Sequence, residues 1–245
     1  MKFNKNYLVD NVKTIIYALV IALVIRSFLI QPFYIPSSSM EPNLLVGDRI
    51  FVSKYSYGYS KHSFPFSPNL FDGRFFFSEP KRGDVVVFKT PTDNRTDYIK
   101  RLIGLPGDTL QFIDGDLFLN DNQILKTKNK IAKNIYCGNI LKETIIFDEK
   151  LPNGIKYFAA YHKKGGFKNS DKFLVPEDHY FFLGDNRDCS KDSRYLGSVG
   201  FVKKENLVGK ARIIFFSSDY RIGSVFKFWN WLEIIRIKRF FKIIR

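Results

Sequence analysis

Cysteine and histidine are scarce in this sequence, which argues against metal sites and against catalysis by histidine. The chain has two cysteines, Cys137 and Cys189, in neither a Cys-x-x-Cys nor a His/Cys zinc pattern. Its three histidines, His62, His162 and His179, show no metal-ligand spacing and no obvious catalytic setting. We therefore expect no metal and no cofactor. The two cysteines could pair in an oxidising compartment or stay free, and the sequence leaves both open.

Acidic residues are outnumbered, with 24 Asp and Glu against 39 Lys and Arg, for a net charge of +15. This charge predicts attraction to anionic surfaces, meaning nucleic acid or acidic lipid. No nucleic-acid-binding motif accompanies it, so we expect no nucleic-acid partner. Hydrophobic residues at 45% exclude a disordered chain, and the 26 Phe and 13 Tyr favour β structure. The 245 residues can bury a sizeable core as one domain or two.

Only one long hydrophobic run is present, at residues 14–25, and it is shorter than the ~20 residues that a spanning helix prefers. If the segment continues through Arg26, whose aliphatic stem can snorkel at a helix end, it reaches a length that is marginal for spanning a membrane. A cleaved signal peptide and a buried helix are the alternatives to an uncleaved anchor. No small-x-small cleavage site follows, and lysines flank only the N-terminal side, so we predict an anchor over 14–31. The lysines also place the tail 1–13 in the cytoplasm and residues from 32 onward outside.

Three serines lie between two prolines shortly after this segment. Residues 36–42 read Pro-Ser-Ser-Ser-Met-Glu-Pro, and the prolines fix their own φ and favour extended residues before them. Ser39 would therefore be presented on a stiff loop, as an attacking hydroxyl requires. It follows the anchor by about nine residues, so it lies within ~30 Å of the bilayer surface. A Ser/Pro-rich linker is the alternative interpretation.

A serine nucleophile needs a base, and the histidines offer no convincing Ser-His-Asp set. A lysine can serve only when neutral, which requires a desolvated setting that lowers its pKa. Lys100 has the best environment of this kind, because apolar residues flank it in a predicted strand over 98–105. An exposed lysine on the wet face of that strand is the usual alternative.

Short apolar runs alternate with turns after the anchor, which predicts a mainly β fold. The expected strands are 48–53, 85–88, 98–105, 109–113, 116–119, 179–183 and 207–216, with weaker signals at 144–147 and 156–159. Asp114-Gly115 predicts a hairpin turn. We expect an antiparallel-sheet catalytic core at 32–119 and 176–222, with a smaller β subdomain inserted at 120–175.

Two further segments have compositions found at membranes. Residues 54–80 carry nine aromatic side chains among prolines and glycines, which is typical of a packed loop or of an aromatic surface at the membrane interface. Residues 223–245 form a basic amphipathic C-terminal tail. Its helical spacing predicts either a helix on anionic lipid or one docked on the domain.

Four motifs together resemble the conserved boxes of bacterial type I signal peptidases, also called leader peptidases. They are Ser37-x-Ser39-Met40-x-Pro42-x-Leu44, Gly83-Asp84-Val-Val-Val-Phe88, Tyr98-Ile99-Lys100-Arg101 with Gly104-Leu-Pro-Gly-Asp108, and Gly184-Asp-Asn-Arg-Asp-x-Ser190-x-Asp-Ser-Arg194. Each is weak alone, but they occur in the family's order and spacing behind an anchor, from residue 33 to about 215. Asn43 and Cys189 stand where the family usually has Thr and Asn, and neither change removes a catalytic group.

The resemblance implies a role for each matching residue. Ser39 would be the nucleophile and Lys100 the general base. The Ser39 N–H and the Ser37 hydroxyl would hold the oxyanion, and Ser190 would hydrogen-bond Lys100. The implied ion pairs that brace the site are Asp185 with Arg101 and Asp192 with Arg194. The residues implied to bind substrate are Phe33, Ile35, Pro36, Met40, Leu44, Val87, Tyr98 and Ile99.

The implied function is removal of signal peptides from exported preproteins by a membrane-anchored Ser/Lys endopeptidase, through an acyl-enzyme, after small residues in an Ala-x-Ala pattern. An extended substrate could add as a strand beside 35–37 and 97–99. The resemblance further implies a monomer in the inner membrane, with its catalytic domain on the periplasmic face, and preproteins and anionic lipid as partners. The alternatives are a self-cleaving Ser/Lys peptidase and a catalytically silent, basic membrane-surface protein.

Overall fold

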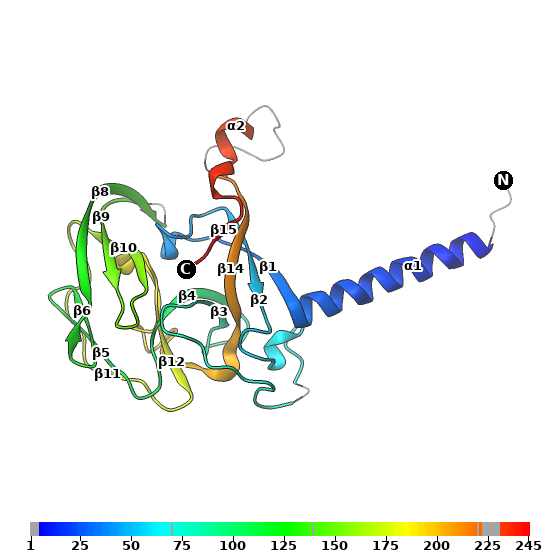
Figure 1. Ribbon diagram of the computed structural model, residues 1–245, viewed down its shortest axis with the longest axis horizontal. Helices are drawn as coiled ribbons and strands as arrows, with labels where there is room; N and C mark the ends of the chain where they lie inside the picture. The colour runs from blue at the N-terminus through cyan, green and yellow to red at the C-terminus, as the bar shows by residue number, and fades with distance from the viewer. Residues whose placement is uncertain (1–4, 70, 139, 220, 222–230) are drawn as a thin grey trace.

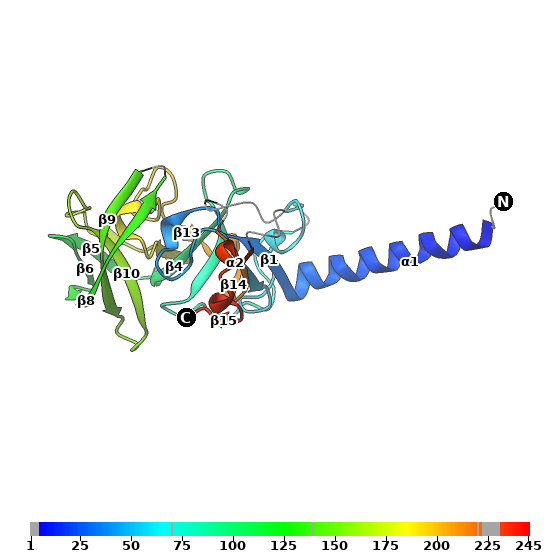
Figure 2. The ribbon, with the colours of Figure 1, turned by 90° about the horizontal axis from the view of Figure 1, so that it is seen from above.

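A long helix projects from a β-rich domain in the computed structural model, which describes residues 5–69, 71–138, 140–219, 221 and 231–245 (Figures 1 and 2). Helix α1 spans Lys5–Val24, and a π-helical turn, η1 (Ile25–Leu29), continues it. Within the described residues, Val9–Leu29 is the one helical stretch long and apolar enough to cross a membrane, with a mean hydropathy of 2.1. Only 6% of that stretch is buried against the rest of the protein, so the domain does not cover its apolar surface.

The helix starts and ends earlier than the sequence predicted. The expected tail 1–13 is helical from Lys5, because no proline or glycine interrupts residues 5–13. Ile30 and Gln31, which we assigned to the anchor, belong to strand β1 (Ile30–Tyr34). Pro32 explains this limit, since it disfavours helical geometry in the residue before it.

The main sheet has eight strands in the order β1-β2-β14-β3-β4-β12-β13, with β15 also pairing with β14. Their bounds are β1 Ile30–Tyr34, β2 Asp48–Ser53, β3 Val85–Lys89, β4 Asp97–Gly104, β12 His179–Leu183, β13 Val202–Lys203, β14 Leu207–Ser217 and β15 Lys242–Ile243. Every pairing in it is antiparallel. The mainly β fold is confirmed, and so is every strand of the main sheet that the sequence predicted. Strands β1, β13 and β15 were not predicted.

Two smaller sheets lie beside the main one (Figure 1). One has the order β11-β5-β6-β7 and the other β10-β9-β8. Their bounds are β5 Thr109–Ile113, β6 Asp116–Leu119, β7 Asn122–Gln123, β8 Leu125–Cys137, β9 Ile140–Lys150, β10 Lys156–His162 and β11 Phe173–Leu174. The predicted turn is confirmed by positive φ angles at Asp114 and Gly115, 50° and 84°. The hairpin 109–119, which we placed in the catalytic core, pairs with β7 and β11 instead of the main sheet.

The small sheets share an apolar core with the main sheet. Leu110 and Phe112 of β5 are buried in one cluster with Ile103 of β4 and with Phe181 and Leu183 of β12. This cluster fixes the small sheets to the two strands that lead into the Lys100 and Ser190 regions.

The described part of the C-terminal tail is not the amphipathic helix that we expected. It consists of α2 (Trp231–Ile234), a 3₁₀ turn η7 (Ile237–Arg239) and strand β15. Ile234 is fully buried, and Ile244 packs against the apolar cluster beneath β1 and β2. The ion pairs of this segment are Arg236 with Asp219 and Arg239 with Asp48. These internal contacts take up side chains that the prediction assigned to lipid, while residues 223–230 lie outside the described residues.

The aromatic segment 54–80 has both packed and exposed rings, and its contact with the membrane interface stays a prediction. Phe28, at the end of the long helix, packs edge-on against Tyr59 and Phe64, with ring centroids 5.4 and 5.5 Å apart. Phe66 and Phe76, in contrast, are 103% and 87% exposed. The segment therefore braces the base of the helix and also presents bare aromatic rings.

Candidate active site

Ser39 lies in a short 3₁₀ turn, η2 (Ser38–Met40), and is buried. The loop after β12 holds this turn, because the Asn186 N–H donates to the Ser39 carbonyl at 3.0 Å and Asn186 Nδ2 donates to the Ser38 carbonyl at 3.2 Å. The Ser39 N–H is among the first amides of the turn, which have no acceptor within it. The turn therefore offers a fixed hydroxyl and a free amide side by side.

Lys100 reaches Ser39 from strand β4. Its Nζ donates to Ser39 Oγ at 2.6 Å and to the Ile99 carbonyl at 3.0 Å, and the residue is only 4% exposed. Burial lowers the pKa of Lys100 from 10.5 to about 8, while the carboxylates of Asp192 and Asp185 act in the opposite direction. The lysine is thus placed and tuned to accept a proton from Ser39 near neutral pH.

Ser37 lies beside Ser39, the predicted nucleophile, and its Oγ is 3.3 Å from Ser39 Oγ. Ser190 is buried close by, but the bond that we expected from it to Lys100 is not formed. The lysine amine is directed to Ser39 and the Ile99 carbonyl, and Ser190 Oγ has no hydrogen-bond partner among the described residues.

Gly184 allows Ser190 and the Ser39 turn to lie so close together. A Cβ at Gly184 would fall 2.1 Å from Ser190 Oγ and 2.6 Å from the Ser39 carbonyl oxygen. Any side chain at this position would therefore push the two serine-bearing segments apart.

Both predicted ion pairs are present. The Arg101 guanidinium donates to both oxygens of Asp185 at 2.7 Å, and neither side chain is exposed. Arg194 donates to the two oxygens of Asp192 at 2.8 and 2.9 Å, and the Gly184 N–H donates to the same carboxylate at 2.9 Å. These bidentate pairs fix the loop 184–194 against β4 and against itself.

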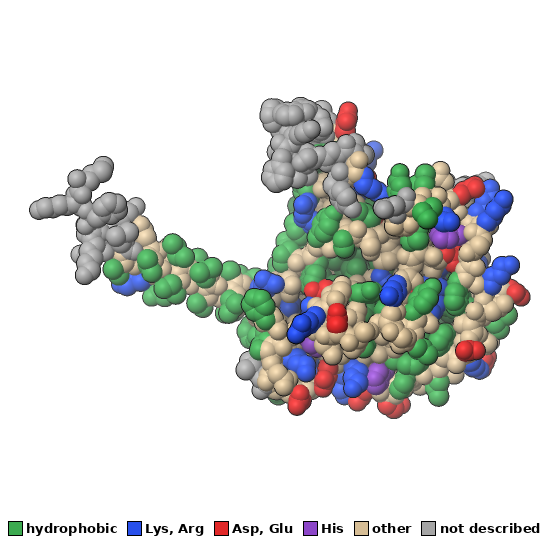
Figure 3. Space-filling view, turned by 180° about the vertical axis from the view of Figure 1, so that it is seen from behind, with side chains coloured by type: hydrophobic (Ala, Val, Ile, Leu, Met, Phe, Trp, Pro, Cys, Tyr) green, Lys and Arg blue, Asp and Glu red, His purple; other side chains and the backbone are tan. Residues whose placement is uncertain are grey.

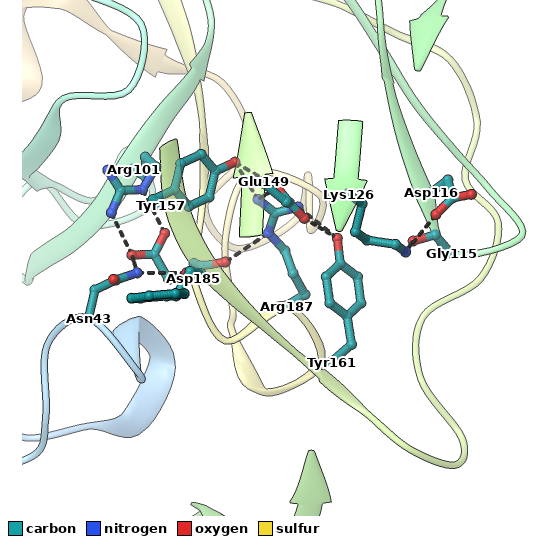
Figure 4. A network of polar contacts seen from close by, with 12 residues as sticks. Asn43, Arg101, Gly115, Asp116, Lys126, Glu149, Tyr157, Tyr161, Asp185 and Arg187 are labelled. Carbon is teal, nitrogen blue, oxygen red and sulfur yellow. Dashed lines mark hydrogen bonds and ion pairs between the residues drawn. The ribbon is translucent and has the colours of Figure 1, made fainter. Parts of the chain in front are cut away.

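A buried polar network next to the site was missed by the sequence analysis (Figure 4). Arg187 pairs with Glu149 at 2.7 Å, and the Tyr157 and Tyr161 hydroxyls donate to the same carboxylate at 2.7 and 2.5 Å. No local sequence pattern predicts this network, because its members come from β9, β10 and the loop after β12. Asn43, whose departure from the family pattern we noted, donates to Asp185 at 2.7 Å and so joins the catalytic turn to this region.

Cys137 and Cys189 form a disulfide, which settles the question that the sequence left open. It connects the end of β8 to the residue before Ser190. Tyr136, Gly138 and Cys189 line a cavity of about 490 Å³ together with the catalytic turn. The tip of the β8–β9 hairpin is therefore a wall of the space in front of Ser39.

Most of the residues expected to bind substrate lie together. Ile35, Met40, Leu44 and Val87 are buried in one apolar cluster, and Phe33 and Ile99 pack against it. Pro36 lines the cavity beside Ser39, whereas Tyr98 packs against a neighbouring cluster that contains Phe88.

The strand edges beside this cluster are open. Strand β12 pairs with β4 only from Arg101 onward, so residues 97–99 lack a partner on that side within the described strands, and β1 pairs only with β2. No group of three or more His, Cys, Asp and Glu side chains in the described part of the chain is arranged to hold a metal.

Comparison with known proteins places this arrangement in a family. A family model described as signal peptidase, peptidase S26, matches residues 8–216. The chain belongs to the signal peptidase family. Signal peptidase I of Rickettsia typhi is 44% identical over 244 residues, covering 92% of this chain and 90% of that protein. Signal peptidase I of Rickettsia prowazekii is 44% identical over 243 residues, with the same coverage.

A solved signal peptidase I from Enterococcus faecalis is 28% identical and covers 54% of this chain and 97% of that one, with a TM-score of 0.31. The score is too low for that structure to support the fold, which rests on the strand topology given above. The family match confirms the resemblance drawn from the four motifs. Peptidase S26 members are serine endopeptidases, so this signal peptidase family member is a hydrolase that acts on signal-peptide-bearing preproteins.

Proposed function

We propose that this chain cleaves signal peptides with Ser39 as the nucleophile and Lys100 as the general base. The observation that carries the proposal is the 2.6 Å contact between Lys100 Nζ and Ser39 Oγ in a buried setting. The neutral amine takes the hydroxyl proton as Ser39 attacks the scissile carbonyl. It then gives that proton to the leaving amine, which leaves an acyl-enzyme, and next activates the water that hydrolyses the ester.

The oxyanion formed in each step needs donors that are already in position. The Ser39 N–H and the Ser37 hydroxyl are the two groups beside Ser39 Oγ that can supply them. Ser190 acts as a positioning residue, because its buried hydroxyl is unpartnered until Lys100 becomes an ammonium and needs another acceptor. Such contacts commonly tighten only when substrate is bound.

The open strand edges support the proposed cleavage after Ala-x-Ala. A substrate strand between residues 35–37 and 97–99 would pair with both edges, and its alternate side chains would point to the same face. That face meets the cluster of Ile35, Met40 and Leu44, which is already close-packed. Because a filled cluster leaves little room for side chains above it, we expect alanine to fit at both alternate positions and larger side chains to be excluded.

The membrane part of the proposal rests on the long apolar helix. Val9–Leu29 would anchor the chain in the bacterial inner membrane as a single span. The flanking lysines favour a cytoplasmic N-terminus and a catalytic domain on the periplasmic face. We further propose that the enzyme acts as a monomer.

Cleavage of a preprotein carrying an Ala-x-Ala site, in detergent, tests the proposal. Wild type should cut after the second alanine, whereas Ser39→Ala and Lys100→Ala should be folded and inactive. Ser38→Ala is the matched control, since the Ser38 hydroxyl is buried in the same turn but lies 3.8 Å from Cys189 Sγ and has no hydrogen bond to Lys100 or Ser37 among the described residues. An active Lys100→Ala variant would refute the Ser/Lys mechanism. A wild type that cleaves only itself, or nothing, would favour the self-cleaving or the silent alternative.

A further inference from the structure

A second cavity, of about 470 Å³, lies where the long helix meets the β domain. Its walls come from the end of the helix, from the aromatic segment and from the loop between β3 and β4, and it shares no lining residue with the cavity beside Ser39. Basic side chains gather on the domain surface next to the base of the helix (Figure 3). We call this space the junction cavity.

The junction cavity holds more positive charge than its own acids neutralise. Four basic side chains line it, Arg26, Lys54, Lys89 and Arg95, against the single carboxylate of Asp97. Lys89 pairs with Asp97 at 2.9 Å. Within the described residues, Arg26 and Arg95 have no side-chain hydrogen bond or ion pair, so four cations share the single carboxylate of the cavity.

Lys54 gives the strongest argument for a bound anion, because this cation is only 2% exposed. Its Nζ donates to the Ser63 carbonyl at 2.7 Å and meets no carboxylate among the described residues. Burial lowers the pKa of neighbouring His62 to about 4, so the imidazole adds no charge at neutral pH. Burial, with the charge of Arg26 as a further cause, lowers the pKa of Lys54 itself to about 8, while Asp97 acts in the opposite direction. The buried ammonium is therefore costly, and an anion in the cavity would remove much of that cost.

The position of the junction cavity identifies the anion. Arg26 lies near the C-terminal end of the apolar stretch Val9–Leu29, so a bilayer spanned by that stretch ends at the cavity. Phe66, on the cavity wall, is fully exposed, as expected of an aromatic ring that meets the membrane interface. The anions at this depth are the phosphates of lipid headgroups.

We propose that the junction cavity binds the phosphate of an anionic phospholipid, with Arg26 and Arg95 at its mouth and Lys54 at its base. The inference rests on the anchoring part of the proposed function. Phe33 and Asp97 also line the cavity, and they border the edges along which the substrate strand would lie. A bound lipid would therefore hold the entrance of the cleft at the bilayer surface, where a signal peptide leaves the membrane.

The test measures lipid binding by the full chain in an uncharged detergent, by calorimetric titration with short-chain phosphatidylglycerol. Wild type should bind saturably, and R26Q/R95Q should bind about 30-fold more weakly, at about fivefold for each basic residue. K164Q/K168Q is the matched control, because it removes the same charge from two exposed lysines elsewhere and should bind like wild type. K54M, which removes the buried ammonium, should also weaken binding.

Several outcomes would overturn the inference. Equal weakening in the control pair would mean that only overall charge matters. Phosphatidylcholine binding as tightly as phosphatidylglycerol would remove the role of net charge, and inorganic phosphate binding as tightly would replace the lipid with a free anion.

Cleavage of a short soluble peptide separates this inference from the proposed function, and R26Q/R95Q should cleave it like wild type. A wild type that binds lipid but cleaves no peptide or preprotein would refute the proposed peptidase function and would not contradict lipid binding in the junction cavity. A wild type that cleaves normally but shows no saturable lipid binding would refute lipid binding in the junction cavity and leave the proposed function in place.

Discussion

Burial of Lys100, the proposed base, should favour activity and lower the stability of the fold. Burial lowers its pKa from 10.5 to about 8. At pH 7 about 9% of such an amine is neutral, against about 0.03% of an ordinary lysine, so burial supplies about 300-fold more of the working base. The same lowering of the pKa of Lys100 corresponds to about 3 kcal/mol of folding free energy lost when the buried amine is held protonated.

Replacing Lys100 with methionine, which has a similar length and no charge, should therefore abolish cleavage and stabilise the fold. The folded state has the lower pKa, so below pH 8 both states are protonated and the penalty is constant. Between about pH 8 and 10.5 the unfolded chain binds more protons, so wild-type stability rises with pH and the advantage of Lys100→Met shrinks. Wild-type kcat/KM should rise with pH along a limb near pH 8.

Chemical denaturation in detergent at several pH values, beside a pH–rate profile, measures both effects. Lys156→Met is a suitable control, because Lys156 is exposed on β10 and should change neither quantity. A Lys100→Met variant that still cleaves, or that is less stable than wild type at pH 7, contradicts the reasoning. So does a rate profile whose limb lies near the ordinary histidine pKa of about 6.5.

Three further changes probe the same site. Ser37→Ala should lower kcat by about 10²–10³ with little change in KM, as loss of one oxyanion donor does; a raised KM with unchanged kcat would instead make Ser37 a substrate contact. Cys137→Ser should lower the unfolding free energy by about 4 kcal/mol, because the bond to Cys189 closes a loop with a sequence separation of 52; an unchanged urea midpoint would contradict this. Deleting 237–245 should destabilise the domain and reduce cleavage even of a short soluble peptide, since it removes β15 and a main-chain acceptor of Arg101. A truncated protein with full peptide cleavage would mean that the segment is dispensable.

Local patterns in the sequence were sufficient for features that depend on neighbouring residues. The turn at Asp114-Gly115 and the strand at 179–183 need only backbone preference and an apolar run, and both were placed correctly. Chemical reasoning on the serine and lysine types identified a nucleophile and a possible base. The family resemblance then joined Ser39 to Lys100 across 61 residues of sequence.

Features that depend on long-range pairing were not accessible from local patterns. β8 runs for 13 residues through a lysine-rich segment with little apolar alternation, and it is a strand because β9 pairs along it. The tail has the composition of a lipid-binding helix, yet Arg239 finds Asp48 only in the folded domain. The Glu149–Arg187 pair likewise depends on a fold that brings β9 beside the loop after β12.

The cations around the Ser39 turn differ in their partners, and this difference supports Lys100, and not Arg101 or Arg194, as the proposed base. Arg101 and Arg194 each have a bidentate carboxylate, so they remain charged and fixed. Lys100 has only a hydroxyl and a carbonyl. The two arginines also partly neutralise Asp185 and Asp192, the two carboxylates that raise the pKa of Lys100. Under the proposed mechanism, both ion pairs would therefore help to keep the Lys100 proton weakly held, and we expect cleavage at neutral pH to depend on both of them.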